Sequence, residues 1–250
     1  MTKEEHSKTN QKDALFRLLR ELAKTDSYIS FDQIKSAARS INLLGSIDTF
    51  KDYLGQAVKM GILHKAGKGW YSRLDEAPSI DPGSVTELIR SVEDAFPLLD
   101  FSTWSTTQLN PWMHHLLAQP VLFLNAPADT LDTVGDNLRG EGWDVAVNPP
   151  PSAASKAIRP GEKMVVLRPT LSRQPTPDNR QASLEQMLVD LLVENSHCRL
   201  MDDSEAKDVA SKTIHSCLLK VAGMQRYAES RKLYWIESIF NPLPSLDEKK

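Results

Sequence analysis

The sequence lacks any hydrophobic run long enough to cross a membrane. Its longest apolar stretches, such as Val121–Leu124 and Met164–Leu167, are far shorter than the roughly 20 residues that a transmembrane helix needs. The N-terminus reads Met-Thr-Lys-Glu-Glu-His and has no apolar segment of the kind found in a secretory signal. We therefore expect a cytoplasmic protein without a membrane partner.

Cysteine and metal-ligand patterns are also scarce. The two cysteines, Cys198 and Cys217, form no Cys-x-x-Cys pair, so we expect reduced thiols of minor structural importance. His114 and His115 are adjacent, and adjacent helical positions point about 100° apart, so the two rings do not share a face as ligands at i and i+4 would. The sequence predicts no metal site and no cofactor.

Familiar catalytic motifs are missing as well. The chain contains no nucleophile elbow, no phosphate-binding glycine loop, no Walker pattern and no His-Glu-x-x-His. A restriction-type nuclease places an acid and a lysine, one residue apart, on a strand so that they position the metal and the water. The corresponding strand, Val121–Ala126, offers apolar residues and an amide. The sequence therefore favours a protein that is not an enzyme.

Charge is present but unevenly distributed. The 250 residues exceed the roughly 100–200 of one domain, so two domains are expected. The net charge is −3, yet residues 1–75 hold 13 basic and 9 acidic residues, which gives +4 and leaves −7 for the remainder. A basic head on an acidic body suggests that the head faces a polyanion.

Residues 1–75 have the pattern of three helices and a hairpin. Leucines follow helical spacing in the first helix, Ser30 and Gln33 form a capping-box pattern that opens the second, and Ser46 caps a third from about Ile47 to Met60. Residues 62–73 suggest two short strands joined by a Lys-Ala-Gly-Lys-Gly turn. This order predicts a winged helix-turn-helix from about Thr9 to Arg73 that binds double-stranded DNA as a monomer or dimer.

The third helix and the hairpin supply the candidate DNA contacts. Polar residues off the apolar stripe of the helix, and lysines of the turn, can reach bases or phosphates, whereas Asp48 and Asp52 would repel phosphate. The candidates are Thr49, Lys51, Gln56, Lys59, Lys65 and Lys68. A simple solvated helix face, and a winged helix that binds protein or RNA, remain alternatives.

A Pro/Gly-rich linker, residues 76–83, precedes an α+β domain over residues 84–250. A helix from Ser84 to Ala95 comes first, and Phe101–Thr106 leads into a helix containing Trp112–Leu117. We then expect strands at 120–125, 143–148 and 163–168, a helix at 129–139, loops rich in proline at 149–160 and 169–179, and helices from Ala182 onward, at 209–219 and at 227–239. The fold class is therefore α+β, with a small sheet and a helical C-terminal end.

One helix of this domain carries acids beside its leucine face. Glu185, Asp190 and Glu194 lie mostly off the face that the leucines of residues 184–192 form. Such a helix either packs within its own domain or presents acid to a basic partner. The aromatic residues Phe96, Phe101, Trp104 and Trp112 favour core packing over a ligand pocket.

Three segments of the chain resemble the abortive-infection (AbiE-type, type IV) antitoxin family of bacterial regulators. They are the hairpin Gly61–Tyr71 after a short helix, Phe101–Leu109 at the entry to the second domain, and Ala182–Leu191 in the helical end. The resemblance spans about residues 10–225. It implies an N-terminal domain that binds inverted repeats in its own promoter and a second domain that counteracts a nucleotidyltransferase-like toxin in phage defence.

If the resemblance holds, the six candidate residues of the N-terminal domain carry the operator contacts and the acidic body carries antitoxicity. Two other classes remain open. One is a nuclease of restriction-endonuclease-like fold that a winged helix directs to DNA. The other is a protein-interaction adaptor that uses the winged-helix fold without DNA.

Overall fold

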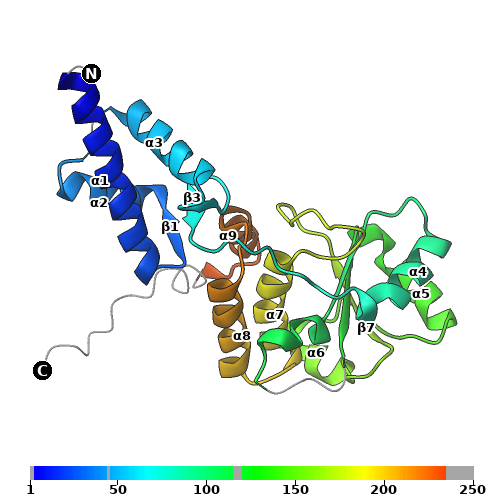
Figure 1. The fold of residues 1–250 in the computed structure, drawn as a ribbon. Helices are drawn as coiled ribbons and strands as arrows, with labels where there is room; N and C mark the ends of the chain where they lie inside the picture. The colour runs from blue at the N-terminus through cyan, green and yellow to red at the C-terminus, as the bar shows by residue number, and fades with distance from the viewer. Residues whose placement is uncertain (1–2, 44–45, 115–119, 235–250) are drawn as a thin grey trace, which may run out of the picture. The chain divides into compact units, whose positions relative to one another are not determined.

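The computed structural model describes residues 3–43, 46–114 and 120–234, which fall into two compact units (Figure 1). Unit 1 contains the chain up to Pro78 together with Ile214–Ala222, and unit 2 contains Ser79–Thr213 and Gly223–Tyr234. The fold is mixed α+β with two small sheets and helices at its C-terminal end, as the sequence predicted. Within the described ranges, no helix combines the length and apolarity that crossing a membrane requires.

In the described residues before Pro78, unit 1 has three helices and a three-stranded antiparallel sheet. Helix α1 (Lys3–Thr25) is followed by strand β1 (Tyr28–Ser30), helices α2 (Phe31–Ser40) and α3 (Ile47–Lys59), and strands β2 (His64–Lys65) and β3 (Trp70–Ser72). The strand order is β1-β3-β2, so β1 pairs with the second strand of the hairpin. The sequence predicted the helices and the hairpin but missed β1, which has only three residues and is defined by its distant partner.

The predicted caps fix the starts of two helices in unit 1. The Ser30 hydroxyl accepts from the Gln33 amide at 3.1 Å, and the Gln33 side chain accepts from the Ser30 amide at 2.7 Å, which completes the capping box. Ser46 caps α3 by accepting from the Thr49 amide at 3.2 Å. The apolar sides of α2 and α3 pack into a common core. That core includes Leu15, Leu19, Ile29, Ile34, Phe50, Leu54 and Leu63.

A late segment of the chain, Ile214–Ala222, belongs to unit 1, and we call it the return segment. The buried Tyr28 hydroxyl donates to the Cys217 carbonyl and accepts from the Leu219 amide at 2.7 Å. The segment also approaches the hairpin closely, because a Cβ added at Gly67 would lie 2.9 Å from the Cβ of Ala222. The sequence, which assigned residues 84–250 to one domain, did not predict this return; its boundary at 76–83 stays a prediction.

Unit 2 is built on a four-stranded sheet of order β4-β5-β7-β6. Strands β5 (Leu122–Ala126), β7 (Met164–Pro169) and β6 (Asp144–Val147) run parallel, and β4 (Ser102–Ser105) is antiparallel to β5. The three parallel strands were predicted. Strand β4 was not: the sequence placed Phe101–Thr106 only as the lead into a helix, but these residues are buried and pair with β5 over four positions.

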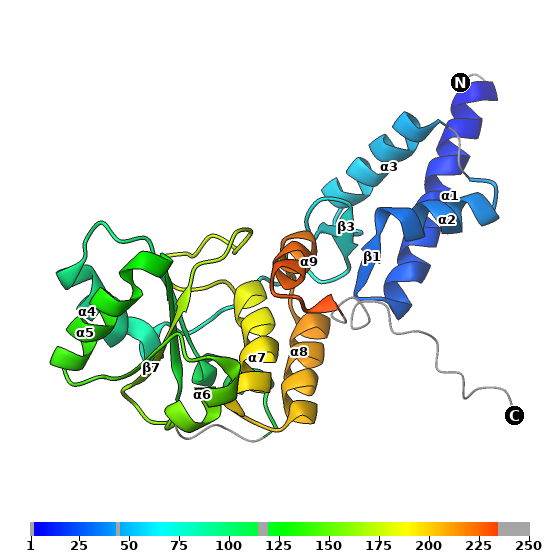
Figure 2. The same cartoon turned by 180° about the vertical axis from the view of Figure 1, so that it is seen from behind.

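Helices cover both faces of this sheet (Figure 2). On one face, α4 (Thr86–Ala95) and α5 (Leu131–Gly140) pack apolar side chains against those of β5 and β7, among them Leu88, Val134, Leu124 and Leu167. On the other face lies α7 (Leu184–Cys198), whose Gln186 and Glu194 contact Asn125 of β5 and Arg168 of β7. One face is therefore apolar, and the other carries buried polar side chains.

The remaining helices of the chain differ in part from the prediction. The 149–160 stretch is not a loop throughout, because α6 (Pro151–Ala157) forms with proline at its first position, where no amide is needed. A 3₁₀ helix (Thr106–Trp112) precedes the predicted 112–117 helix, of which residues 115–117 lie outside the described part. Helix α8 (Asp203–Ser216) begins and ends earlier than predicted, as does α9 (Val221–Ser230); residues 235–239 are not described.

Two further short 3₁₀ helices, Gly83–Val85 and Ala128–Thr130, precede α4 and α5. The second loop predicted to be rich in proline, 169–179, has neither helix nor extended strand after Pro169. It ends at a β-bridge between Asp178 and Gln181, next to the start of α7. Both loops lie in the sequence near the ends of strands β6 and β7.

We expect Tyr28→Phe to destabilise unit 1 by about 1–3 kcal/mol, because it leaves the Leu219 amide and the Cys217 carbonyl without their partner. Urea denaturation gives the free energy of unfolding, and hydrogen exchange should show a faster amide at Leu219. Tyr234→Phe is the control, since that side chain is 70% exposed. Equal stability of the two variants would mean that the Tyr28 hydroxyl does not anchor the return segment.

Candidate functional site

The first candidate site is the surface of α3 and the hairpin. Of the predicted residues, Lys51 and Lys59 on α3 and Lys65 and Lys68 on the hairpin are exposed. None of the four forms an ion pair with another residue of the described ranges. The other two predicted residues are more constrained: Thr49 is half-buried and shares a hydrogen bond with Ser46 at 2.8 Å, and Gln56 is half-buried.

Acidic and basic residues of this surface lie in different parts of the sequence. The acidic residues of α3, Asp48 and Asp52, are exposed in its first half. From Tyr53 to Leu74 the chain contains no acid but three lysines and one arginine, and Gly55 leaves the middle of the exposed face without a side chain. The basic part of the surface is therefore the end of α3 together with the hairpin. The DNA-contacting role of the six residues stays a prediction.

Hairpin geometry keeps its lysines at the surface. The Ala66 amide donates to the Trp70 carbonyl at 3.0 Å, and the turn passes through Gly67 and Gly69 with φ values of 105° and 77°. These are left-handed conformations that favour glycine. Lys68 stands between the two glycines and projects from the exposed turn, while Tyr71 on β3 packs against the core. Trp70 is half-buried.

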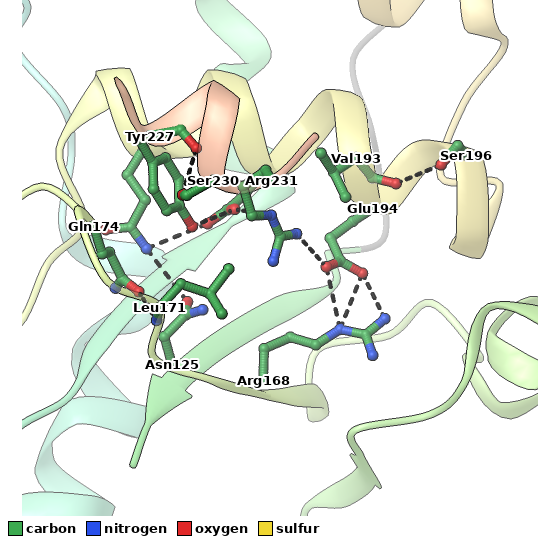
Figure 3. A network of polar contacts seen from close by, with 12 residues as sticks. Asn125, Arg168, Leu171, Gln174, Val193, Glu194, Ser196, Tyr227, Ser230 and Arg231 are labelled. Carbon is green, nitrogen blue, oxygen red and sulfur yellow. Dashed lines mark hydrogen bonds and ion pairs between the residues drawn. The ribbon is translucent and has the colours of Figure 1, made fainter. Parts of the chain in front are cut away.

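The second candidate site is a buried cluster of charged side chains in unit 2 (Figure 3). Glu194 on α7 accepts hydrogen bonds from the Arg168 guanidinium, at 3.1 Å from Nε and 2.6 Å from Nη2. It also accepts from Nη2 of Arg231 at 2.7 Å. The side chains of Glu194 and of both arginines are at most 9% exposed. One carboxylate thus joins strand β7, helix α7 and the segment after α9.

The cluster continues along α7 through Asp190. Its Oδ1 accepts from the Tyr227 hydroxyl at 2.7 Å and lies 3.4 Å from Nε of Arg231. Gln186, one turn earlier, contacts Asp190 Oδ2 and Asn125 at 3.3 Å each. Positions 186, 190 and 194 fall on one side of the helix, so the polar row faces the sheet and α9 instead of solvent. We call Asp190, Glu194, Arg168 and Arg231 the charge cluster.

Burial and the arginines move the two carboxyl groups in opposite directions. Burial raises the pKa of Asp190 to about 6, against the opposing effects of the Arg231 charge and the Tyr227 hydrogen bond. Burial also acts on Glu194, but Arg168 and Arg231 outweigh it and hold its pKa below the ordinary value. Burial raises the pKa of the neighbouring Cys198 to about 12, so that residue is an unreactive thiol.

A cavity of about 420 Å³ opens beside the charge cluster. It lies at the carboxyl ends of the parallel strands β6 and β7, where open α/β sheets commonly bind ligands. Its polar lining consists of Asn148, Arg168, Glu194, His197, Ser230, Arg231 and Lys232, and its apolar lining consists of Pro149, Pro150, Pro151, Pro169, Leu171 and Val193. Because four prolines form part of the wall, we call it the proline-walled cavity.

Two residues of the cavity lining have left-handed backbone conformations. Asn148, just after β6, has φ of 38°, and Lys232, just after α9, has φ of 59°. At Lys232 the amide donates to Glu229 and the next amide, of Leu233, donates to Ala228, which is the Schellman arrangement that ends many helices. Glycine is the usual residue at this position. A lysine there costs backbone energy, and this lysine belongs to the lining of the cavity.

The sequence analysis identified the two acidic residues of the charge cluster but not its two arginines. It singled out Asp190 and Glu194 as acids beside a leucine face and offered a basic partner as one explanation. The structure instead pairs them with arginines of the same unit, and Glu185, the third acid, is also buried. Arg168 and Arg231 were missed. The available signal was an arginine at the end of the apolar strand Met164–Leu167, together with polar residues four apart on an otherwise apolar helix.

The aromatic residues of unit 2 are mainly part of the core, as the sequence favoured. Trp104 and Phe101 are buried, and the Trp104 ring stacks on that of Phe123 with 4.4 Å between centroids. Phe96 packs at the edge of the same core, and Trp112 is half-buried.

Both cysteines are free and buried. In the part of the chain that is described, no three His, Cys, Asp or Glu residues gather closely enough to hold a metal ion.

Comparison with known proteins identifies a family but no activity. The model of a family of unknown function (DUF6577) matches residues 49–238, about three quarters of the chain, and the chain belongs to this family. The match begins within α3 and includes the hairpin and the whole charge cluster. No curated protein and no solved structure matches the chain.

We expect Asp190→Asn to change how stability depends on pH. Because folding raises the pKa of Asp190, its contribution is fully present below about pH 4, the unfolded value, and is lost as pH rises through about 6. Relative to the wild type, the Asn variant should therefore gain up to about 3 kcal/mol between pH 4 and pH 7.5. Urea denaturation across this range measures the difference.

The control for that measurement is Asp208→Asn, an exposed carboxyl group on α8. Glu194 has a lowered pKa, so its own contribution is lost only at the acid end of this range, as pH falls below its ordinary value. A stability difference between Asp190→Asn and the wild type that stays constant from pH 4 to 7.5 would contradict the raised pKa.

Proposed function

We propose that this member of the DUF6577 family is a DNA-binding regulator whose unit 1 is a winged helix-turn-helix. The observation that carries the proposal is the order of elements in unit 1, in which a helix, a strand, two helices and a hairpin form a sheet of order β1-β3-β2. In a helix-turn-helix the second helix of the motif enters the major groove. Helix α3 is in that position, and the hairpin that follows it is the wing.

The charge pattern supports DNA as the partner. Lys59, Lys65 and Lys68 are exposed, and the residues between Tyr53 and Leu74 include no acid to oppose them. Lysines can contact phosphates without sequence preference, and they fix the position of a protein on the duplex. The first half of α3 carries Asp48 and Asp52, which would be repelled by phosphates. We therefore place the main phosphate contacts at the end of α3 and on the wing.

Thr49 and Gln56 have a narrower role in this proposal. Thr49 is occupied by the cap of α3, where its side chain bonds to Ser46, so it serves the helix start before it can serve DNA. Gln56 is half-buried and leaves only part of its amide for a base. The exposed Lys51 lies between the two aspartates in sequence, so its net attraction to phosphate is reduced.

Autorepression and antitoxin activity extend the proposal through the resemblance to AbiE-type antitoxins. On that reading, unit 1 binds inverted repeats of the operator in the cytoplasm, and unit 2 counteracts a nucleotidyltransferase-like toxin from the neighbouring gene in phage defence. The acidic helix α7 does not supply the toxin-facing surface, because Asp190 and Glu194 are buried against their own arginines. Exposed acids elsewhere in unit 2, such as those of α8, are the better candidates.

Two other functions are distinguished by simple outcomes. A nuclease directed by a winged helix would cleave DNA in the presence of a divalent metal ion. An adaptor would bind a protein partner tightly while failing to bind a duplex at any salt concentration. Of the three, the regulator is favoured by the exposed lysines of unit 1.

We expect the full chain to bind a duplex taken from upstream of its own gene with strong salt dependence. Fluorescence anisotropy between about 50 and 200 mM salt gives the slope of log affinity against log salt concentration. Replacing Lys59, Lys65 and Lys68 together by Gln should reduce this slope by about 3, since each phosphate contact contributes about 0.9. Asp48→Asn with Asp52→Asn should tighten binding, because two repelling carboxylates are removed.

The matched control replaces lysines outside the proposed interface, Lys24→Gln on α1 together with Lys156→Gln on α6, both exposed. This variant should keep most of the wild-type slope. If it lost as much salt dependence as the triple variant, the attraction would be diffuse and the wing would have no special role. Failure of the wild type to bind any duplex at low salt would remove DNA from the proposal.

A neighbouring gene for a nucleotidyltransferase-like protein tests the antitoxin part. We expect expression of that neighbour alone to arrest growth and co-expression with this chain to restore it. The Lys59, Lys65 and Lys68 variant should still rescue growth from a heterologous promoter, because rescue would be a property of unit 2. A toxic neighbour that this chain does not neutralise would end the antitoxin proposal while leaving DNA binding intact.

A further inference from the structure

The proline-walled cavity has features of a ligand site that the proposed DNA binding does not use. Its volume of about 420 Å³ lies within the roughly 300–1,000 Å³ of small-molecule sites. It lies entirely in unit 2, at the carboxyl ends of β6 and β7. Its lining combines apolar residues, four prolines with Leu171 and Val193, with charged ones.

The charged residues of the lining retain hydrogen-bond donors. Both oxygens of Glu194 already accept from the arginines, so that carboxylate has little capacity left. Nη1 of Arg231 has no hydrogen-bond partner among the described residues, and Figure 3 shows it as the terminal nitrogen without a dashed line. The Arg231 side chain is only 9% exposed, its Nη2 donates to Glu194, and its Nε lies 3.4 Å from Asp190 Oδ1. Nη1 is therefore the donor of this guanidinium that a ligand could use.

Charge in the lining is positive. Arg168, Arg231 and Lys232 are the basic residues of the lining and Glu194 is its carboxylate. Asp190, outside the lining but 3.4 Å from Nε of Arg231, offsets a further charge, so the local excess near neutral pH is one positive charge. His197 adds none near neutral pH, because burial lowers its pKa. Lys232 stands at the left-handed position after α9, where glycine would relieve the backbone, and it belongs to the lining of the cavity.

We propose that the proline-walled cavity binds an organic phosphate monoester, with its phosphate on Arg231 and Lys232 and its apolar body against the prolines. A phosphate monoester carries between about −1.5 and −2 charges at pH 7 and offers three acceptor oxygens, where a carboxylate offers two, to the N–H donors of Arg231 and Lys232. Arginine binds phosphate through paired N–H donors, and lysine adds a point charge. The volume exceeds that of a phosphate ion and leaves room for a ring beside Pro149 and Pro169.

Phenyl phosphate, inorganic phosphate and benzoate test the proposal with the full chain in isothermal titration calorimetry. Phenyl phosphate should bind more tightly than inorganic phosphate, because only its ring meets the apolar wall, and more tightly than benzoate, because only it carries a second negative charge. Equal binding of phenyl phosphate and inorganic phosphate, or of phenyl phosphate and benzoate, would overturn the assignment. So would the absence of binding of phenyl phosphate up to about 10 mM.

Lys232→Gly is the decisive variant, since glycine suits the left-handed backbone and the melting temperature should be kept or raised. Its affinity for phenyl phosphate should fall about tenfold, the loss expected for one charge-assisted hydrogen bond. Lys156→Gly, on α6 outside the cavity lining, is the control and should retain the wild-type affinity. Unchanged affinity in a folded Lys232→Gly protein would overturn the site.

Arg231→Lys adds a second, independent measurement. It keeps a positive charge near Glu194 and Asp190 but removes the free Nη1 donor, so the protein should remain folded by circular dichroism while phenyl phosphate binds more weakly. Wild-type affinity in this variant would contradict the role of Arg231. The salt dependence of DNA binding should be the same in all of these variants, which separates this proposal from the one made for unit 1.

Discussion

Unit 2 depends on the carboxylate of Glu194 and the two arginines that it holds. Arg168 comes from the end of a strand and Arg231 from the end of a helix, and Glu194 lies between them on α7. Removing one member of such a buried group costs about 3–5 kcal/mol, because the remaining charges lose their compensation. The three charges therefore stabilise the fold only when all three residues are present. Their joint effect is to fix α7 over the polar face of the sheet and to set the position at which α9 ends.

Sequence reasoning succeeded where local patterns determine the structure. The helices of unit 1 and the strands β5, β6 and β7 follow from apolar spacing and caps, which are local properties of the chain. Ser30 with Gln33 and Ser46 with Thr49 form the caps that the sequence predicted. Helical spacing did not predict the surroundings of the acids of α7. Spacing shows that Asp190 and Glu194 share a side of the helix, but it does not tell whether that side meets solvent or two arginines at sequence separations of 26 to 41 residues.

Short elements failed for a related reason. Strands β1 and β4 have three and four residues, too few to set up a periodic pattern, and each exists because a distant strand pairs with it. Helix α6 was hidden by the prolines of 149–160, although a proline at the first helical position is well tolerated. The return segment is the extreme case. Its association with unit 1 rests on Tyr28, whose hydroxyl bonds to residues about 190 positions later in the chain.

The extent of the family match does not coincide with a folding unit. It begins at residue 49, inside α3, yet Phe50 and Leu54 of that helix are buried with Leu15, Leu19 and Ile34, which precede the matched region. A chain that started at residue 49 would expose this apolar side of α3. The lysines of α3 and the hairpin can be presented to a partner only when α1 and α2 complete the core beneath them. The proposed DNA-contacting lysines therefore lie in the matched region, but the stability of the surface that carries them depends on the whole of unit 1.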